Sequence, residues 1–156
     1  MWRHSLLVAL LLVVISPLTT AARRATAPKP NVMITKAVQA VLDAQAAAWN
    51  RGDIEGFMAG YWRSEDTIFV SGDSLTRGWQ TVLDRYKKNY ATREKMGTLI
   101  YSDLEITPIG TDAAIALGRW HLQRAKDEPH GRFTLIFRRT KQGWRIVHDH
   151  TSSASA

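Results

Sequence analysis

The stretch GRFTLIFRRTKQGWRIVHDHTS, residues 131–152, decides the fold of this chain. It contains two runs of alternating apolar and polar side chains. Lys141, Gln142 and Gly143 between the runs have the composition of a tight turn. Alternation with a period of two is typical of β-strands whose two faces have different surroundings. The sequence therefore predicts a long antiparallel hairpin over residues 131–140 and 143–151.

Strand patterns continue toward the N-terminus. Two longer runs cover about residues 98–107 and 112–125, and a short run covers residues 66–71. Turn-forming residues at 108–112 and 126–131 separate the long runs. These patterns predict a meander of four strands preceded by one short strand.

Three earlier segments repeat apolar side chains at steps of three and four. They cover residues 34–50, 54–62 and 78–92, and each predicts an amphipathic helix. Gly52 is placed to end the first helix, and Asp53 is placed to cap the second. Helices followed by a strand meander predict an α+β fold, in which three helices pack on one face of a curved antiparallel sheet.

The first residues have the layout of a secretory signal peptide. Met1–His4 is a short positive region, Leu6–Ile15 is an unbroken apolar run, and small residues follow up to Ala22. The apolar run is about half the ~20 residues that a membrane-spanning helix needs. We expect cleavage after Ala22 or Ala21, and a secreted or periplasmic protein with no membrane attachment after cleavage.

The same reading divides the rest of the chain. A flexible leader over residues 23–32 is expected from two prolines and the lack of an apolar period. A single domain is expected over residues 33–152, followed by a tail over residues 153–156.

The composition excludes several classes of function. The chain has no cysteine, so it has neither disulfides nor thiolate chemistry. Its net charge is +7, but the charges are scattered, and we expect no nucleic-acid partner. No glycine-rich phosphate loop is present, and no cofactor is predicted. His148 and His150 share a strand face, but a metal site would need a third converging ligand, and no metal is predicted.

Four segments together resemble a known family. They are AAWNRGDIEGFMAGYW (47–62), DTIFV (66–70), GRFTLIFRR (131–139) and GWRIVHDHTS (143–152). They resemble the SnoaL-like branch of the nuclear transport factor 2-like superfamily, and the last is also similar to the association domain of calcium/calmodulin-dependent kinase II. The resemblance implies a cone-shaped bent sheet around three helices, a pocket at its wide end, and a homodimer formed through the sheet.

The resemblance also bears on chemistry. Gln45 and Ser71 stand where the steroid-isomerase members of the superfamily carry a tyrosine and an aspartate. Neither residue can be a carboxylate base, so the sequence does not support isomerase chemistry by that route. No acidic residue has a clear claim to a buried site.

Candidate ligand-binding residues follow from the same comparison. Arg119 aligns with a pocket arginine of the kinase domain, and His121 shares its strand face. The opposite face, which carries Trp120, is more apolar, so hydrophobicity alone would turn that face inward instead. The alignment favours Arg119 and His121 near the polar end of the pocket. The family's geometry adds Trp49 and Tyr61 as ligand-facing residues, and Tyr101 is added as an aromatic candidate.

Three functions remain open. The first is binding of a small, partly apolar, acidic molecule in the pocket. The second is an isomerase, cyclase or hydrolase acting on a hydrophobic metabolite, for which His121 is the only catalytic candidate. The third is an oligomerisation module without a ligand, because the fold by itself does not determine a function.

Overall fold

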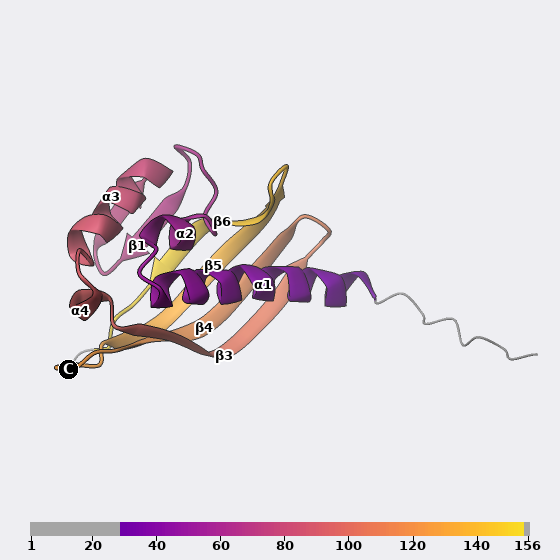
Figure 1. The fold of residues 1–156 in the computed structure, drawn as a ribbon. Helices are drawn as coiled ribbons and strands as arrows, with labels where there is room; N and C mark the ends of the chain where they lie inside the picture. Colours follow the sequence, from indigo (N-terminus) through magenta and orange to yellow (C-terminus); the bar gives the residue numbers. More distant parts are fainter. Residues whose placement is uncertain (1–28, 155–156) are drawn as a thin grey trace, which may run out of the picture.

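The structure is a computed structural model that describes residues 29–154 (Figure 1). The predicted signal peptide and most of the predicted leader lie outside the described residues, and so do the last two residues of the predicted tail. Its elements are α1 (Pro30–Asn50), α2 (Ile54–Met58), β1 (Ile68–Ser71), β2 (Ser74–Arg77), α3 (Trp79–Asn89), α4 (Arg93–Met96), β3 (Thr98–Ile109), β4 (Ala113–Gln123), β5 (His130–Thr140) and β6 (Gly143–Thr151). The α+β class is confirmed. No helix within residues 29–154 is long and apolar enough to span a membrane.

The sheet has six strands in the order β2-β1-β6-β5-β4-β3. All neighbours are antiparallel except β1 and β6, which run parallel. The predicted count of five strands is wrong. The residues of β2 have the composition of a polar turn, so no strand was predicted there. Gly72 has a φ of 59°, which lets the chain reverse within two residues, so β2 can pair with β1.

Helix α1 lies across the concave face of the curved sheet (Figure 1). It buries Val38, Leu42 and Trp49 against the sheet. It begins at Pro30, four residues before the predicted start, because proline is well suited to the first position of a helix. Asp53 caps α2 as predicted, since its carboxylate accepts a hydrogen bond of 2.7 Å from the N–H of Gly56.

Helix α2 ends earlier than the sequence predicts, and its end positions Tyr61. The chain leaves the helix after Met58, and Tyr61 forms a parallel bridge to Ile146 of β6. The bridge is held by an N–H from Trp62 to the Ile146 carbonyl at 2.8 Å and an N–H from Ile146 to the Gly60 carbonyl at 2.9 Å. Tyr61 is therefore attached to the sheet and is not part of a helix.

A bulge in β6 changes which side chains face the interior. Ile136 pairs with His148 and Phe137 pairs with Ile146, so Val147 has no partner on β5. An unpaired residue reverses the alternation of side chains beyond it. Ile146 and Asp149 therefore both point inward, although they are three residues apart.

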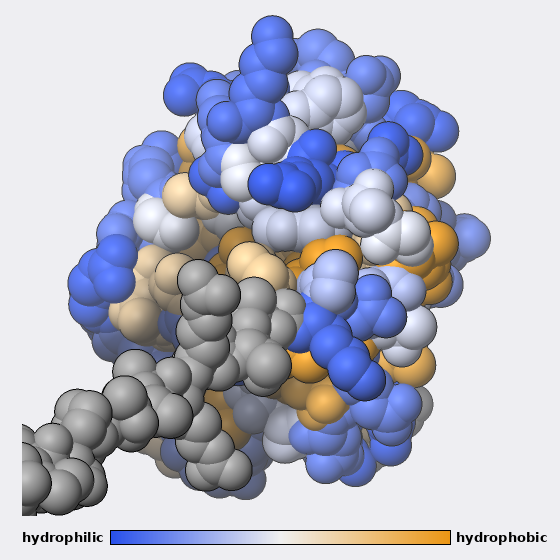
Figure 2. All heavy atoms as spheres, turned by 90° about the vertical axis from the view of Figure 1, so that its right-hand side faces the viewer, coloured by the Kyte–Doolittle hydropathy of each residue, from blue (hydrophilic) through white to orange (hydrophobic). Residues whose placement is uncertain are grey.

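The two ends of α1 have different surroundings. Around its first turn the apolar side chains of Val32 and Met33 are exposed, and Ile109 is exposed at the end of β3. Figure 2 views the molecule from this end, where hydrophobic surface shows between hydrophilic surface. The other end of α1 packs against α3 and α4, and a cavity lies there.

Candidate functional site

A cavity of about 120 Å³ lies beneath the C-terminal end of α1. It is bounded by α3, by the segment from α2 to β1, and by the inner faces of β3, β4, β5 and β6. Nine of its 19 lining residues are aromatic, among them Trp49, Phe57, Tyr61, Tyr86, Tyr90 and Phe133. The volume is enough for a group the size of a single aromatic ring.

Asp149 is the acidic residue of the cavity, and it is only 3 % exposed. Its Oδ2 accepts a hydrogen bond of 2.6 Å from the hydroxyl of Tyr61, and its Oδ1 accepts one of 2.6 Å from the hydroxyl of Thr151. Burial raises the pKa of Asp149 to about 6, because the charged form loses its hydration, although both hydrogen bonds oppose the shift. Asp149 can therefore change its protonation state near neutral pH.

Tyrosine hydroxyls surround this carboxyl group. The hydroxyl of Tyr86 lies 3.4 Å from that of Tyr61. Burial raises the pKa of Tyr61 and of Tyr86 well above the ordinary tyrosine value, and it also raises the pKa of Tyr101. All three phenols are therefore protonated at neutral pH. Tyr86, Tyr61 and Asp149 form a connected set of groups that can hold a proton.

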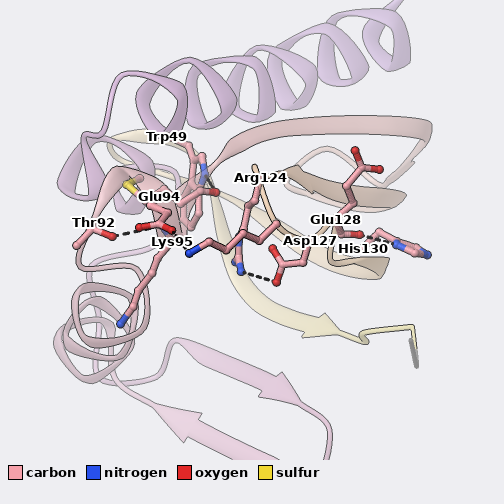
Figure 3. A network of polar contacts seen from close by, with 10 residues as sticks. Trp49, Thr92, Glu94, Lys95, Arg124, Asp127, Glu128 and His130 are labelled. Carbon is pink, nitrogen blue, oxygen red and sulfur yellow. Dashed lines mark hydrogen bonds and ion pairs between the residues drawn. The ribbon is translucent and has the colours of Figure 1, made fainter.

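Trp49 gives the cavity a rigid wall. Its ring meets those of Tyr90 and Phe57 edge to face, with centroids 4.7 and 5.1 Å apart. Its Nε1 donates to the carbonyl of Met96 at the end of α4, at 3.1 Å, and the indole lies between α1 and this short helix (Figure 3). The first helix, α3 and α4 are therefore coupled around one edge of the cavity.

The loop between β4 and β5 supports the same edge. Arg124 forms an ion pair with Asp127, with Nη1 and Oδ2 3.5 Å apart (Figure 3). The guanidinium carbon of Arg124 lies 5.9 Å from the centroid of the Tyr90 ring. Tyr90, which lines the cavity from the end of α3, is held from its other side by this cation–π contact.

The mouth of the cavity is polar. Asn89 and Ser153 are exposed lining residues, and Ser71 and Arg85 are half-buried. Arg85 is the cationic side chain among the lining residues, and its guanidinium carbon lies 5.2 Å from the centroid of the Phe69 ring. Arg85 is thus placed to meet an anionic group of a molecule that enters.

Gln45 borders the cavity from α1. Its Nε2 donates to the carbonyl of Phe57 at 3.0 Å, which determines the orientation of the amide. Its Oε1 is buried and has no hydrogen-bond partner within residues 29–154. Gly60 makes room for this side chain, because a Cβ there would lie 2.6 Å from the amide carbon of Gln45.

Comparisons with known proteins agree with this architecture. The family model of the SnoaL-like domain matches residues 38–156. The chain belongs to the SnoaL-like domain family. No curated protein matches it. An NTF-2-like protein of unknown function from Shewanella oneidensis is 40% identical, with a TM-score of 0.74 over 77% of this chain and 99% of that one.

More distant structures share the fold. A nuclear transport factor 2-like superfamily protein from Salmonella enterica is 20% identical, with a TM-score of 0.64 over 80% of this chain and 94% of that one. A ketosteroid isomerase-like protein from Erwinia carotovora atroseptica is 19% identical, with a TM-score of 0.62 over 78% and 96%. The predicted recognition of a SnoaL-like, nuclear transport factor 2-like domain is therefore confirmed.

Three of the predicted ligand-binding residues lie together in this SnoaL-like domain. Trp49, Tyr61 and Tyr101 all line the cavity. Their contact with a ligand stays a prediction. Gln45 and Ser71 also border it.

Arg119 and His121 are placed elsewhere, and their expected position near the polar end of the pocket is wrong. They lie on the face of β4 that carries the exposed Leu117, whereas Trp120 and Leu122 on the opposite face line the cavity. His121 instead lies 3.4 Å from Glu128, measured from Nε2 to Oε2. Hydrophobic alternation along this strand is therefore the better guide to its inner face.

Asp149 is the residue that sequence reasoning missed. Strict alternation from Trp144 and Ile146 assigns Asp149 to the outer face of β6, and the bulge at Val147 reverses this assignment. The signal that could have found it is local: Ile146 and Val147 are two consecutive apolar residues, which break the alternation at the point where a bulge can reverse it. His148 and His150 do not converge with other ligands, since residues 29–154 contain no cluster of His, Cys, Asp and Glu that could hold a metal.

Proposed function

We propose that this SnoaL-like domain binds a small, partly apolar molecule in the cavity and holds the molecule's polar group against Asp149 and Tyr61. The observation that carries the proposal is a buried carboxyl group inside an aromatic cavity. A cavity with apolar walls and a few convergent polar groups is the usual form of a small-molecule site.

The site expected to bind an acidic group of the ligand must lie elsewhere in the cavity. Arg119 does not line the cavity, so it cannot hold a carboxylate inside. Arg85 does line the cavity at its mouth, and its guanidinium can pair with an acid there. An acidic group of the ligand would therefore lie at the mouth, away from Asp149, with the apolar part inside.

Binding can be tested by filling the cavity. Leu135 of β5 lines the cavity, and Leu135→Phe places a larger side chain in it. Ile136→Phe is the matched control, because Ile136 is the next residue, on the outer face, and 36 % exposed. Thermal shift and calorimetry with a panel of single-ring compounds should lose binding for Leu135→Phe only. A panel in which no compound binds the wild-type protein would contradict the proposal.

A second function, proton transfer of the isomerase type, is favoured by the titration of Asp149. A general base works best when its pKa lies near the working pH, and burial raises the pKa of Asp149 to about 6. Asp149 replaces His121 as the candidate base and is held by the hydroxyl of Tyr61, and Tyr86 is the candidate donor to a developing negative charge. Deuterium exchange into an enolisable aryl ketone, followed by NMR, should be lost in Asp149→Asn. Exchange that survives this substitution would exclude the role.

Export and assembly are further parts of the proposal. The layout of residues 1–22 supports a secreted or periplasmic protein, which N-terminal sequencing of the exported protein would test by showing a start near Arg23.

The exposed apolar side chains Ile100, Leu117 and Ile136 on the outer face of the sheet support a homodimer. Leu117→Lys should convert the dimer to a monomer in light scattering. An unchanged mass would contradict this interface.

A further inference from the structure

The ligand's chemical class can be narrowed further. We infer that the inner end of the cavity recognises an organic cation, namely a protonated amine attached to a small apolar group, with Asp149 as its counter-ion. The inference rests on the proposed function, because it concerns the same cavity. It concerns a different part of the cavity from the acidic group that was proposed at the mouth.

Asp149 has no partner of opposite charge within residues 29–154. Within the described part of the chain it takes part in no ion pair, and its two hydrogen bonds come from the neutral hydroxyls of Tyr61 and Thr151. A buried carboxylate without a counter-charge is costly, and an ammonium group of a ligand would remove that cost. An ionised carboxylate has about four acceptor positions, so two remain for a ligand.

The groups around Asp149 do not supply the missing charge. Its register neighbours are Phe69 on β1 and Leu135 on β5. Tyr86 faces it from α3 and Tyr101 from β3, and burial keeps both phenols protonated and neutral. His150 follows it on β6, and its positive charge when protonated lowers the pKa of Asp149, but His150 is exposed to solvent and forms no ion pair with Asp149 among residues 29–154.

Arg85 is the remaining cation of the cavity, and it lies at the mouth. Its guanidinium is positioned over the ring of Phe69, and it makes no ion pair among residues 29–154. Solvent at the mouth screens its repulsion of a cation at the inner end. Arg85→Gln should therefore strengthen amine binding slightly.

The aromatic wall of the cavity also favours a cation. Trp49, Tyr86 and Tyr90 border the cavity, with ring centroids between 4.7 and 6.1 Å apart. The faces of such rings carry negative potential and attract ammonium groups. A wall of aliphatic side chains would not favour a charged ligand over a neutral one. Rings combined with one unpaired carboxylate favour a positively charged ligand.

The competing possibility is that Asp149 binds as the neutral acid and donates to a carbonyl group. The two possibilities predict opposite pH dependence. An amine needs ionised Asp149, so its affinity should rise as the pH increases through about 6. A carbonyl needs protonated Asp149, so its affinity should fall over the same range.

Three compounds with the same ring but different charge make the test. Benzylamine, benzyl alcohol and benzoate are titrated into the full-length mature protein by calorimetry at about pH 5 and about pH 8. Benzylamine should bind at least ~10-fold more tightly than benzyl alcohol at the higher pH, and this preference should shrink at the lower pH. Asp149→Asn should abolish the preference.

A second variant covers the case in which Asp149→Asn does not fold. Thr151→Val removes one hydrogen bond that lowers the pKa of Asp149, so the pH at which benzylamine binding strengthens should move upward. Equal affinity for the amine and the alcohol, or a preference that survives Asp149→Asn, would overturn the inference while leaving the proposed function intact. If none of the three compounds binds, both fail.

Discussion

Two halves of the sheet's inner face differ in how they are filled. In one half, Phe137 of β5 and Ile146 of β6 are completely buried, together with Leu42 of α1. In the other half, Phe133 and Asp149 of the same two strands border a cavity. Neighbouring parts of one surface thus form a solid core and a hollow site. Stability and ligand recognition are therefore divided along the strands of this SnoaL-like domain.

The division has a local cause in β4 and β6. Ala114 of β4 pairs with Phe137, and both are completely buried, so small and large side chains fill the space together. At the cavity end, the bulge at Val147 brings a carboxyl group inward where an apolar residue would pack. Keeping such a group buried lowers stability, which is a common property of functional sites.

The largest expected effect compares two phenylalanines of β5. Phe137→Ala should lower the free energy of unfolding by about 3–5 kcal/mol, because it leaves a void in a filled core. Phe133→Ala should cost at least ~1 kcal/mol less, since one side of its ring already faces a cavity and lacks partner atoms there. Urea denaturation measures both. Equal losses would show that the two halves are packed alike.

The next effect concerns Asp149 and pH. The pKa of this group is about 6 in the folded protein and 3.8 ordinarily, so folding favours its protonated form. Its contribution to the free energy of unfolding is fully present below the ordinary pKa and is lost as the pH rises through about 6. The loss amounts to at most ~3 kcal/mol. Asp149→Asn cannot ionise, so it should be the more stable protein at neutral pH.

The difference between Asp149→Asn and the wild-type protein should decrease as the pH falls toward about 4, where the wild-type group is protonated. Urea denaturation over a pH series measures this difference, and titrating groups that do not interact with Asp149 cancel because both proteins share them. A stability difference that stays constant across the series would show that Asp149 has an ordinary pKa.

A smaller effect is expected for the hydrogen bond between Tyr61 and Asp149. Tyr61→Phe removes the donated O–H, which should cost about 1.5 kcal/mol above pH 6 and raise the pKa of Asp149. Tyr101→Phe is the control, because Tyr101 lines the same cavity without a hydrogen bond to Asp149. NMR titration of the Asp149 carboxyl follows both variants. Identical shifts in the two would contradict the specific role of Tyr61.

The smallest effect separates the two faces of the sheet. Arg119→Gln should change the affinity for benzoate by less than about twofold, because Arg119 lies outside the cavity. Arg85→Gln makes the same chemical change at the mouth and should weaken benzoate at least ~5-fold. Calorimetry measures both. A larger loss for Arg119→Gln would restore the original assignment of the pocket face.

Much of the fold could be predicted because it depends on local patterns. The period of two along residues 131–151 indicated the β5–β6 hairpin, and the steps of three and four indicated α1. The turn at Gly52 and the cap at Asp53 could be predicted for the same reason, since a few neighbouring residues determine them. The short strand β2 was missed because its four residues have almost no apolar alternation.

The site was only partly predictable because it depends on contacts between distant segments. Trp49, Tyr61 and Tyr101 could be nominated from aromatic character and the family's geometry. Arg119 was nominated from alignment against the hydrophobic alternation of its own strand, and the alternation was the better guide.

What the sequence determined by itself is the α+β order of elements and the apolar faces that join them, because both follow from periodicities within single segments. Only the tertiary structure decided that Asp149 faces inward and meets Tyr61 and Tyr86. The physical reason is that this meeting depends on one unpaired residue in β6 and on the bridge from Tyr61 to Ile146. Both features exist only when strands far apart in the chain are hydrogen-bonded to each other.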